Sequence, residues 1–229
     1  MRRLFAAFLF LLPLAAMAGG QQKTFDEGIE YQLISPRPTL PLNVSKGKVQ
    51  VAEFFWYQCP HCAHLEPTLE HWRRHDMPAD VEFVRVPAVL APNWYFMARV
   101  YYTAQLLGVE ARMTPILFKA IQADGRKMED LKGVEALFAR QGVPEKRFKE
   151  AFESLAVSTR VRRAIQLTHE YGITGVPTLV VNGRYRVDPN RVGSYPRMLR
   201  VVDYLVHHVH DENVHAGHAQ QHTDLSRAE

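Results

Sequence analysis

A short apolar stretch that ends in two closely spaced cysteines constrains this 229-residue chain most strongly. The run Val49–Phe55 is rich in β-branched and aromatic residues, which predicts a buried strand. Helical spacing of apolar residues begins soon afterwards, at Leu65, Leu69 and Trp72. The only two cysteines, Cys59 and Cys62, therefore lie where a strand passes into the first turn of a helix. This setting favours thiol redox chemistry.

The start of a helix stabilises a thiolate placed there. Backbone N–H groups of the first turn lack partners and the macrodipole adds partial positive charge, so we expect a lowered pKa for Cys59. Pro60 suits this turn because its missing N–H costs nothing, and His61 adds a positive charge or a donor when protonated. We expect Cys59 to be the exposed attacking thiol and Cys62 the more buried resolving thiol. A stabilised thiolate favours the reduced form and makes the disulfide a stronger oxidant.

Three other roles for the cysteine pair fit the sequence less well. A structural disulfide across three residues would constrain almost none of the unfolded chain. A structural zinc ion needs about four ligands, and Cys59, His61, Cys62 and His64 are too crowded on one turn to supply them. An inert reduced pair of core cysteines is disfavoured by the strand-to-helix setting.

Residues 1–18 have the pattern of a cleaved secretory signal peptide. Arg2 and Arg3 precede an apolar run over 4–16, and Ala16-Met17-Ala18 provides the small residues of a cleavage site. The run is shorter than the roughly 20 residues of a membrane span, although an uncleaved anchor is the alternative. We therefore expect export to an oxidising compartment, the periplasm, where a cysteine pair can act as an oxidant.

The charge balance gives no reason to expect a nucleic-acid partner. Loss of Arg2 and Arg3 with the signal peptide reduces the 28 basic residues to 26, against 24 acidic ones. No basic patch stands out along the sequence, and 47% hydrophobic residues are enough for an ordinary core. Nothing in the sequence requires more than a monomer.

The remaining pattern predicts an α/β frame interrupted by helices. Residues 19–45 form a proline-containing extended segment with an edge strand over 29–34, and 81–86 alternates as a strand parallel to the first. Five helices follow, at about 95–107, 112–122, 130–140, 145–153 and 157–171. Thr178–Val181 and Arg184–Val187 flank Asn182-Gly183, the pair that favours a type I′ hairpin turn, and a last helix covers about 195–209.

Two polar features leave alternatives open. Glu53 lies in the middle of the predicted central strand, where a carboxylate is costly to ionise. We expect it to tune the nearby thiols or to move protons during thiol exchange. The alternative is a carboxylate on a solvated strand edge. Residues 211–229 are polar and lack periodicity, so we expect a disordered tail. Six of the eleven histidines fall between His207 and His222, which permits metal binding, but a solvated tail without a metal is favoured.

These motifs together resemble the bacterial DsbA-type thiol:disulfide oxidoreductases, a thioredoxin-fold family with an inserted helical domain. The resemblance rests on Glu53-Phe-Phe before Cys59-Pro-His-Cys62, the helical block, and Gly175-Val-Pro177 followed by a strand, and it spans roughly 46–209. That family is itself a standard example of a C-x-x-C pair with an acidic thiol. The resemblance implies a thioredoxin-like domain over 46–90 and 172–210 and a helical insertion over 91–171.

The resemblance also implies roles for single residues. Cys59 matches the nucleophile, Cys62 the resolving cysteine and His61, after Pro60, the residue that makes the pair oxidising. Pro177 matches a cis-proline packed against the disulfide, and Val176 before it offers main-chain pairing to a bound peptide. Glu53 matches a buried acidic residue of the family.

The expected activity is therefore donation of the Cys59–Cys62 disulfide to unfolded exported proteins through a mixed disulfide. The protein needs no cofactor beyond that disulfide, and a quinone-linked membrane protein of the DsbB type would reoxidise it. One alternative is a thiol reductase or disulfide isomerase of the same fold. The other is a non-catalytic metal-binding or chaperone module, whose activity would survive replacement of both cysteines.

Overall fold

The structure, a computed structural model, describes residues 24–42, 45, 47–128 and 130–225, and their side chains as far as Glu212. The predicted signal peptide lies outside these residues. Within them, no helix combines the length and the apolar character that a membrane span requires.

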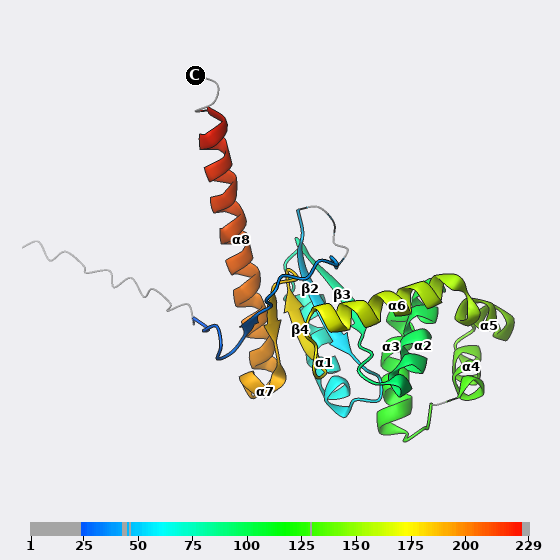
Figure 1. The fold of residues 1–229 in the computed structure, drawn as a ribbon. Helices are drawn as coiled ribbons and strands as arrows, with labels where there is room; N and C mark the ends of the chain where they lie inside the picture. Colours follow the sequence, from blue (N-terminus) through cyan, green and yellow to red (C-terminus); the bar gives the residue numbers. More distant parts are fainter. Residues whose placement is uncertain (1–23, 43–44, 46, 129, 226–229) are drawn as a thin grey trace, which may run out of the picture.

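A five-stranded mixed sheet forms the centre of the molecule (Figure 1). Its strands are β1 (Gln32–Leu33), β2 (Val49–Phe55), β3 (Val81–Pro87), β4 (Thr178–Val181) and β5 (Tyr185–Val187), in the order β1-β5-β4-β2-β3. β2 and β3 are parallel, as predicted for consecutive strands joined by a helix, and the other neighbours are antiparallel. Asn182 and Gly183 both have positive φ angles (51° and 64°) between β4 and β5, as the predicted hairpin turn requires.

The central strand β2 is buried on both faces because its two sets of alternating side chains enter different cores. Val49 and Val51 join a cluster with Leu65, Leu69 and Trp72 of α1 (Pro60–His75) and with the apolar face of α8 (Tyr195–Leu225). Ala52 and Phe54 join the cluster that continues into the helical part of the chain. α1 therefore lies directly on the sheet, and the end of β2 feeds into its first turn.

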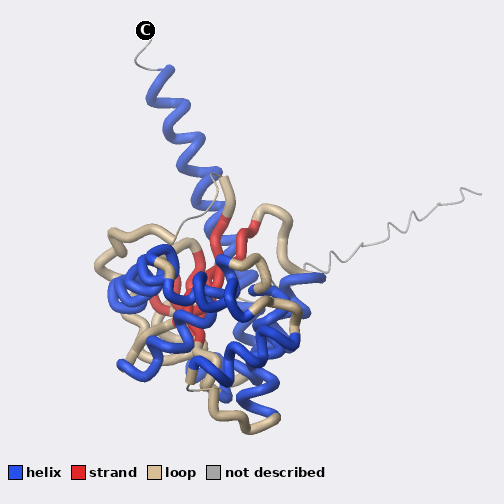
Figure 2. Tube along the Cα trace, turned by 90° about the vertical axis from the view of Figure 1, so that its right-hand side faces the viewer, coloured by secondary structure: helices blue, strands red, loops and turns tan. Residues whose placement is uncertain are grey.

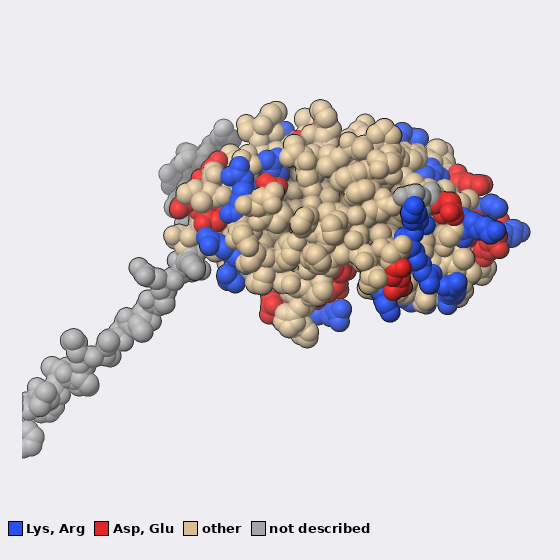
Figure 3. Space-filling view, turned by 90° about the horizontal axis from the view of Figure 1, so that it is seen from below, with Lys and Arg blue, Asp and Glu red and all other residues tan. Residues whose placement is uncertain are grey.

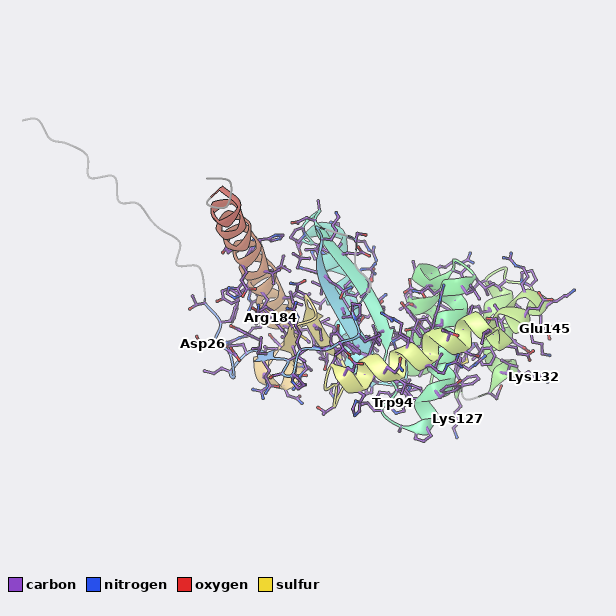
Figure 4. The ribbon with its side chains drawn as sticks, turned by 45° about the horizontal axis from the view of Figure 1, so that its top comes forward. Asp26, Trp94, Lys127, Lys132, Glu145 and Arg184 are labelled. Carbon is purple, nitrogen blue, oxygen red and sulfur yellow. The ribbon has the colours of Figure 1, made fainter. Side chains whose placement is uncertain are left out.

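The chain between β3 and β4 is helical, as predicted for an inserted block. It contains η1 (Pro92–Trp94), α2 (Tyr95–Leu106), α3 (Glu110–Phe118), the π-helical turn η2 (Lys119–Ala123), α4 (Leu131–Arg140), α5 (Glu145–Glu153) and α6 (Leu155–Glu170). Figure 1 shows these helices gathered beside the sheet, with α6 leading back to it, and in Figure 2 they are seen from their own side, in front of the strands. In Figure 4, Lys132 and Glu145 mark the far end of this block, and Asp26 and Arg184 lie on the sheet side.

The structure differs from the sequence-based expectation at two places. The edge strand expected over 29–34 is reduced to Gln32–Leu33, which pairs with β5. The expectation of disorder from Asp211 onward was wrong as far as Leu225, because α8 continues to that residue. The segment contains no proline, and a helix already nucleated on the packed sheet is extended at little cost by residues such as Ala and Gln.

Candidate active site

Cys59 occupies the N-cap position of α1, and Pro60 is the first residue of that helix. Cys62 lies in the first turn with no exposed surface, whereas the Cys59 side chain retains 8% exposure. Both are free thiols in this structure. The order of accessibility follows the prediction, but Cys59 is itself largely buried rather than exposed, because a distant loop packs against it.

That loop contains Val176 and Pro177, which are joined by a cis peptide bond as expected. The Cys59 thiol donates a hydrogen bond to the carbonyl oxygen of Val176 at 3.3 Å, across 117 positions of sequence. The fold therefore brings the C-x-x-C motif and the Val-Pro pair together in one site.

The pKa of Cys59 is lowered to about 6 from its usual value near 9. The hydrogen bond from the Cys62 side chain is the largest cause, and burial acts against it. Backbone N–H groups of Cys62 and His61 and the charge of His61 add to the lowering. The lowered pKa of Cys59 agrees in direction with the sequence-based prediction, but its main cause is the Cys62 thiol, and the backbone N–H groups of the helix start contribute less.

The pKa of Cys62 moves in the opposite direction, well above its usual value. Burial is the main cause, followed by the hydrogen bond to Cys59 and the negative charge of Glu53. The two sulfurs are therefore electrostatically distinct: one carries the negative charge and the other holds the proton.

Glu53 has no exposed surface and lies in the central strand of the sheet, which excludes the alternative of a solvated edge. Its Oε2 accepts a hydrogen bond of 2.8 Å from Nε of Arg85, its direct neighbour in β3. Burial raises the pKa of Glu53, while the Arg85 charge opposes that rise. Surrounding carboxylates hold the pKa of Arg85 above its usual value against the effect of burial, so the guanidinium stays charged.

Sequence reasoning missed the rest of this buried cluster. Nη2 of Arg85 also contacts Glu66 Oε2 at 2.7 Å and Glu70 Oε1 at 3.1 Å, both on α1. Glu66 lies one helical turn after Cys62, and burial raises its pKa to about 7. An ionisable residue in the middle of each of two predicted parallel strands was the available signal, since burial requires such groups to pair.

An open groove of ≈ 750 Å³ lies beside the cysteines and is lined by His61, Val176, Pro177 and Tyr195, together with Arg186 and Asp188. Both apolar and charged side chains therefore line the groove. Figure 3 shows the face at the end where β2 finishes: Lys, Arg, Asp and Glu gather at its two sides and at its lower edge, and a broad region between them carries almost none.

Among residues with described side chains, no three His, Cys, Asp or Glu groups come close enough to hold one metal ion.

The model of the DsbA-like thioredoxin domain matches residues 50–196 of this chain. The chain belongs to this family. It is 35% identical over 201 residues to the thiol:disulfide interchange protein DsbA of Pseudomonas syringae pv. tomato, covering 88% of this chain and 92% of that protein. The crystal structure of Pseudomonas aeruginosa DsbA superimposes with a TM-score of 0.75 at 34% identity, covering 84% of this chain and 97% of that one. The oxidoreductase DsbA from Xylella fastidiosa gives a TM-score of 0.72 at 35% identity, covering 80% and 96%.

Membership in the DsbA-like family confirms the fold class and the type of reaction. The protein is a thiol:disulfide oxidoreductase with a thioredoxin fold and an inserted helical domain, and Cys59 and Cys62 are its C-x-x-C pair. It acts as an oxidase, exchanging disulfides with substrate proteins.

Proposed function

We propose that this oxidase works in the periplasm on unfolded, newly exported proteins, with Cys59 as the attacked sulfur and Cys62 as the resolving thiol. The observation that carries the proposal is the unequal pair of sulfurs: a lowered pKa at Cys59 beside a raised pKa at the buried Cys62. Residues 1–18, with the composition of a signal peptide, support the location.

In the first step, a substrate thiolate attacks Sγ of Cys59 in the disulfide form. The new bond joins the substrate sulfur to Cys59, the Cys59–Cys62 bond breaks, and Cys62 leaves as a thiolate that takes up a proton because its pKa is raised. A second substrate thiolate then attacks the substrate sulfur of the mixed disulfide. Cys59 leaves as a stable thiolate, so the substrate loses two electrons and the enzyme is reduced.

Pro60, His61, Val176 and Pro177 position the reacting groups. Pro60 starts α1, and the charge of His61 contributes to lowering the pKa of Cys59, which improves Cys59 as a leaving group. The backbone of Val176, which lies against the Cys59 sulfur, is placed to pair with the main chain of a bound peptide, with Pro177 beside it in the groove.

Glu53 acts through Cys62 rather than on the substrate. Its negative charge raises the pKa of the Cys62 thiol, and Oε1 of Glu53 has no hydrogen-bond partner among the described residues. A buried carboxylate with a free oxygen can hold the proton that Cys62 needs when it leaves.

Reoxidation requires an acceptor for two electrons outside this chain. We assign this role to a membrane protein of the DsbB type that passes the electrons to a quinone, and we expect the oxidase to act as a monomer. No cofactor other than the disulfide takes part in the cycle proposed here.

The deciding experiment is the equilibrium of the Cys59–Cys62 pair against a series of glutathione buffers. Trp56 is a suitable fluorescence reporter, because its ring stacks on that of Trp94 with centroids 4.0 Å apart near the start of α1. An oxidase that donates disulfides stays reduced until the buffer is strongly oxidising. A pair that forms its disulfide in a reducing buffer would instead support the reductase alternative.

A trapping experiment tests the residue roles. In Cys62→Ala, the Cys59 thiolate should attack an unfolded substrate whose cysteine is held as a mixed disulfide with glutathione, release glutathione as a thiol and accumulate as a mixed disulfide with the substrate, while Cys59→Ala should accumulate none. Accumulation through Cys62 in the second variant would refute the assignment of Cys59 as the attacked sulfur.

A further inference from the structure

Two surface grooves meet at the side chain of Arg186 in β5. The first is the groove of ≈ 750 Å³ beside the cysteines, and the second, of ≈ 330 Å³, lies where the chain after β1 passes the end of α6. Arg186 and Gln32 line both grooves, so the two adjoin each other across this pair of side chains. The second groove therefore continues the surface that begins beside the redox site.

Arg186 is fixed at the junction by three neighbours. Its guanidinium donates hydrogen bonds to the side chain of Gln32, to the carbonyl oxygen of Gly172 and, at 3.3 Å, to Asp188. These partners belong to β1, to the turn after α6 and to the residue that follows β5. The two grooves therefore keep one relative position before any chain binds, which lowers the entropy cost of binding across both.

One stretch of main chain runs past both grooves. Tyr171 and Gly172 line the second groove, and residues 174–177 line the first. At the redox end of this stretch, the carbonyl oxygen of Val176 accepts the hydrogen bond from Cys59. Four residues of chain span at most about 14 Å, so an extended substrate covers the distance from Val176 to Gly172 in about four residues.

The second groove has both apolar and polar walls, as contact with a chain of varied sequence requires. Leu33, Ile34 and Pro36 form its wall at β1 and in the loop that follows. His169 and Glu170 form its wall at the end of α6. Leu33 keeps 38% of its surface exposed, so apolar area is available there to a bound side chain.

Hydrogen bonds between the two walls form this groove without a ligand. The Glu170 carboxylate accepts hydrogen bonds of 2.9 Å from the backbone N–H groups of Thr39 and Leu40. The Tyr171 hydroxyl donates to the carbonyl oxygen of Leu40 at 3.2 Å. The loop after β1 is thus tied to the end of α6, and the groove is ready to accept a chain without rearrangement.

We propose that the second groove binds the continuation of the substrate chain, at residues about four to eight positions from the cysteine that reacts with Cys59. This assignment rests on the proposed function, because the occupant is the same unfolded substrate. An extended chain that follows the loop back from Val176 passes Arg186 and enters the second groove. The contact adds affinity for long unfolded segments, whereas short ones bind only beside the cysteines.

The test compares two reduced peptides that share one central pair of cysteines. One has flanks of about two residues, and the other has flanks of about ten residues that alternate leucine and serine. Each peptide gives two electrons and two protons to the Cys59–Cys62 disulfide and leaves as its own disulfide, and Trp56 fluorescence follows the reaction. We expect the second-order rate constant to be roughly ten-fold higher for the long peptide.

Two variants block the second groove from different walls. His169→Trp and Ser35→Trp replace exposed residues that line it, and each should bring the ratio of the long-peptide to the short-peptide rate constant to about one. Ala156→Trp is the matched control, because it adds an exposed indole near the start of α6, about 20 Å from His169. Its ratio should equal that of the wild type.

Equal rate constants for the two peptides in the wild type would overturn this assignment of the groove alone. A ratio that His169→Trp and Ser35→Trp leave unchanged would do the same. A concentration-dependent dimer that both variants abolish in sedimentation would assign the groove to a second copy of the chain and would also overturn it. If neither peptide reduces the disulfide, the proposed oxidase function fails as well, so the two failures are distinguishable.

Discussion

Glu53 and Arg85 lie directly opposite each other in the parallel strands β2 and β3, and their side chains form an ion pair of 2.8 Å in the buried centre of the sheet. Both are almost completely buried, at 0% and 7% exposure. Removing two charges from water is costly, so the pair itself contributes little net stability. The negative charge of Glu53 raises the pKa of the Cys62 thiol, so the pair affects the redox site.

Loss of the Arg85 charge should destabilise the protein strongly. Arg85→Met would leave Glu53 and Glu66 buried without their cation, and we expect a loss of about 3–5 kcal/mol in the free energy of unfolding by urea. Arg74→Met is the matched control, because Arg74 also pairs with Glu70 but is 70% exposed, and it should cost at most about 1 kcal/mol. Similar losses in both variants would contradict a special role for the buried cluster.

The sequence was sufficient to predict the redox pair because that motif depends on local structure. A strand followed by Cys59-Pro-His-Cys62 and a helical pattern predicts a helix start, and both the N–H groups of that turn and the second cysteine of the motif lower the pKa of Cys59. Glu53 could be recognised as unusual for the same reason, since a charged residue in an apolar strand conflicts with its surroundings.

Long-range contacts were not predictable in this way. The partners of Arg85 come from β2 and α1, and no local pattern specifies which of the many glutamates face it. The length of α8 was underestimated, because polar composition indicates solvation but does not distinguish a coil from a solvated helix that continues from a packed one.

The thiol of Cys59 should titrate near pH 6 in the reduced protein. Thiolate absorbance in the ultraviolet measures this directly, and Cys59→Ser should remove the transition. Cys62→Ala should move the midpoint to higher pH, because the hydrogen bond from Cys62 is the largest cause of the lowering. A midpoint unaffected by Cys62→Ala would mean that the backbone of α1 alone sets the acidity.

The same shift makes the stability of the reduced form depend on pH. The pKa of Cys59 is depressed from about 9 in the unfolded chain to about 6 in the folded one, so its contribution is complete above pH 9 and is lost as the pH falls through 6. The urea midpoint of the reduced protein should therefore rise relative to that of the oxidised protein between these values. A difference between the two forms that stays constant with pH would contradict the proposed thiolate.

The Glu66 carboxyl should make the folding stability depend on pH in the opposite direction. Its pKa is raised by burial to about 7, so the folded state binds a proton that the unfolded chain releases near pH 4.5. Stability from this group is present below pH 4.5 and is lost as the pH rises through 7. Between pH 4.5 and pH 7, the free energy of unfolding by urea should therefore fall less in Glu66→Gln than in the wild type. Glu150→Gln on the exposed side of α5 is the control, and it should follow the wild-type curve.

A hydrogen bond between Trp72 and Asp203 joins α1 to α8. The indole N–H of the buried Trp72 donates a hydrogen bond of 2.7 Å to Asp203 of α8, at the end of α1 away from the cysteines. Trp72→Phe removes the donor and leaves the half-buried carboxylate without its partner, so we expect a loss of about 2 kcal/mol or more in the free energy of unfolding. A double-mutant cycle with Asp203→Ala, which removes the acceptor, should give a coupling energy of roughly 0.5–3 kcal/mol.

This contact is expected to support the fold without tuning the chemistry, because it lies more than two helical turns beyond Cys62. The glutathione equilibrium of the Cys59–Cys62 pair should therefore be the same in both single variants and the wild type. A shift in that equilibrium would show that the position of α1 on α8 affects the thiols. A coupling energy indistinguishable from zero would show that the hydrogen bond contributes nothing and that the loss in Trp72→Phe comes from packing alone.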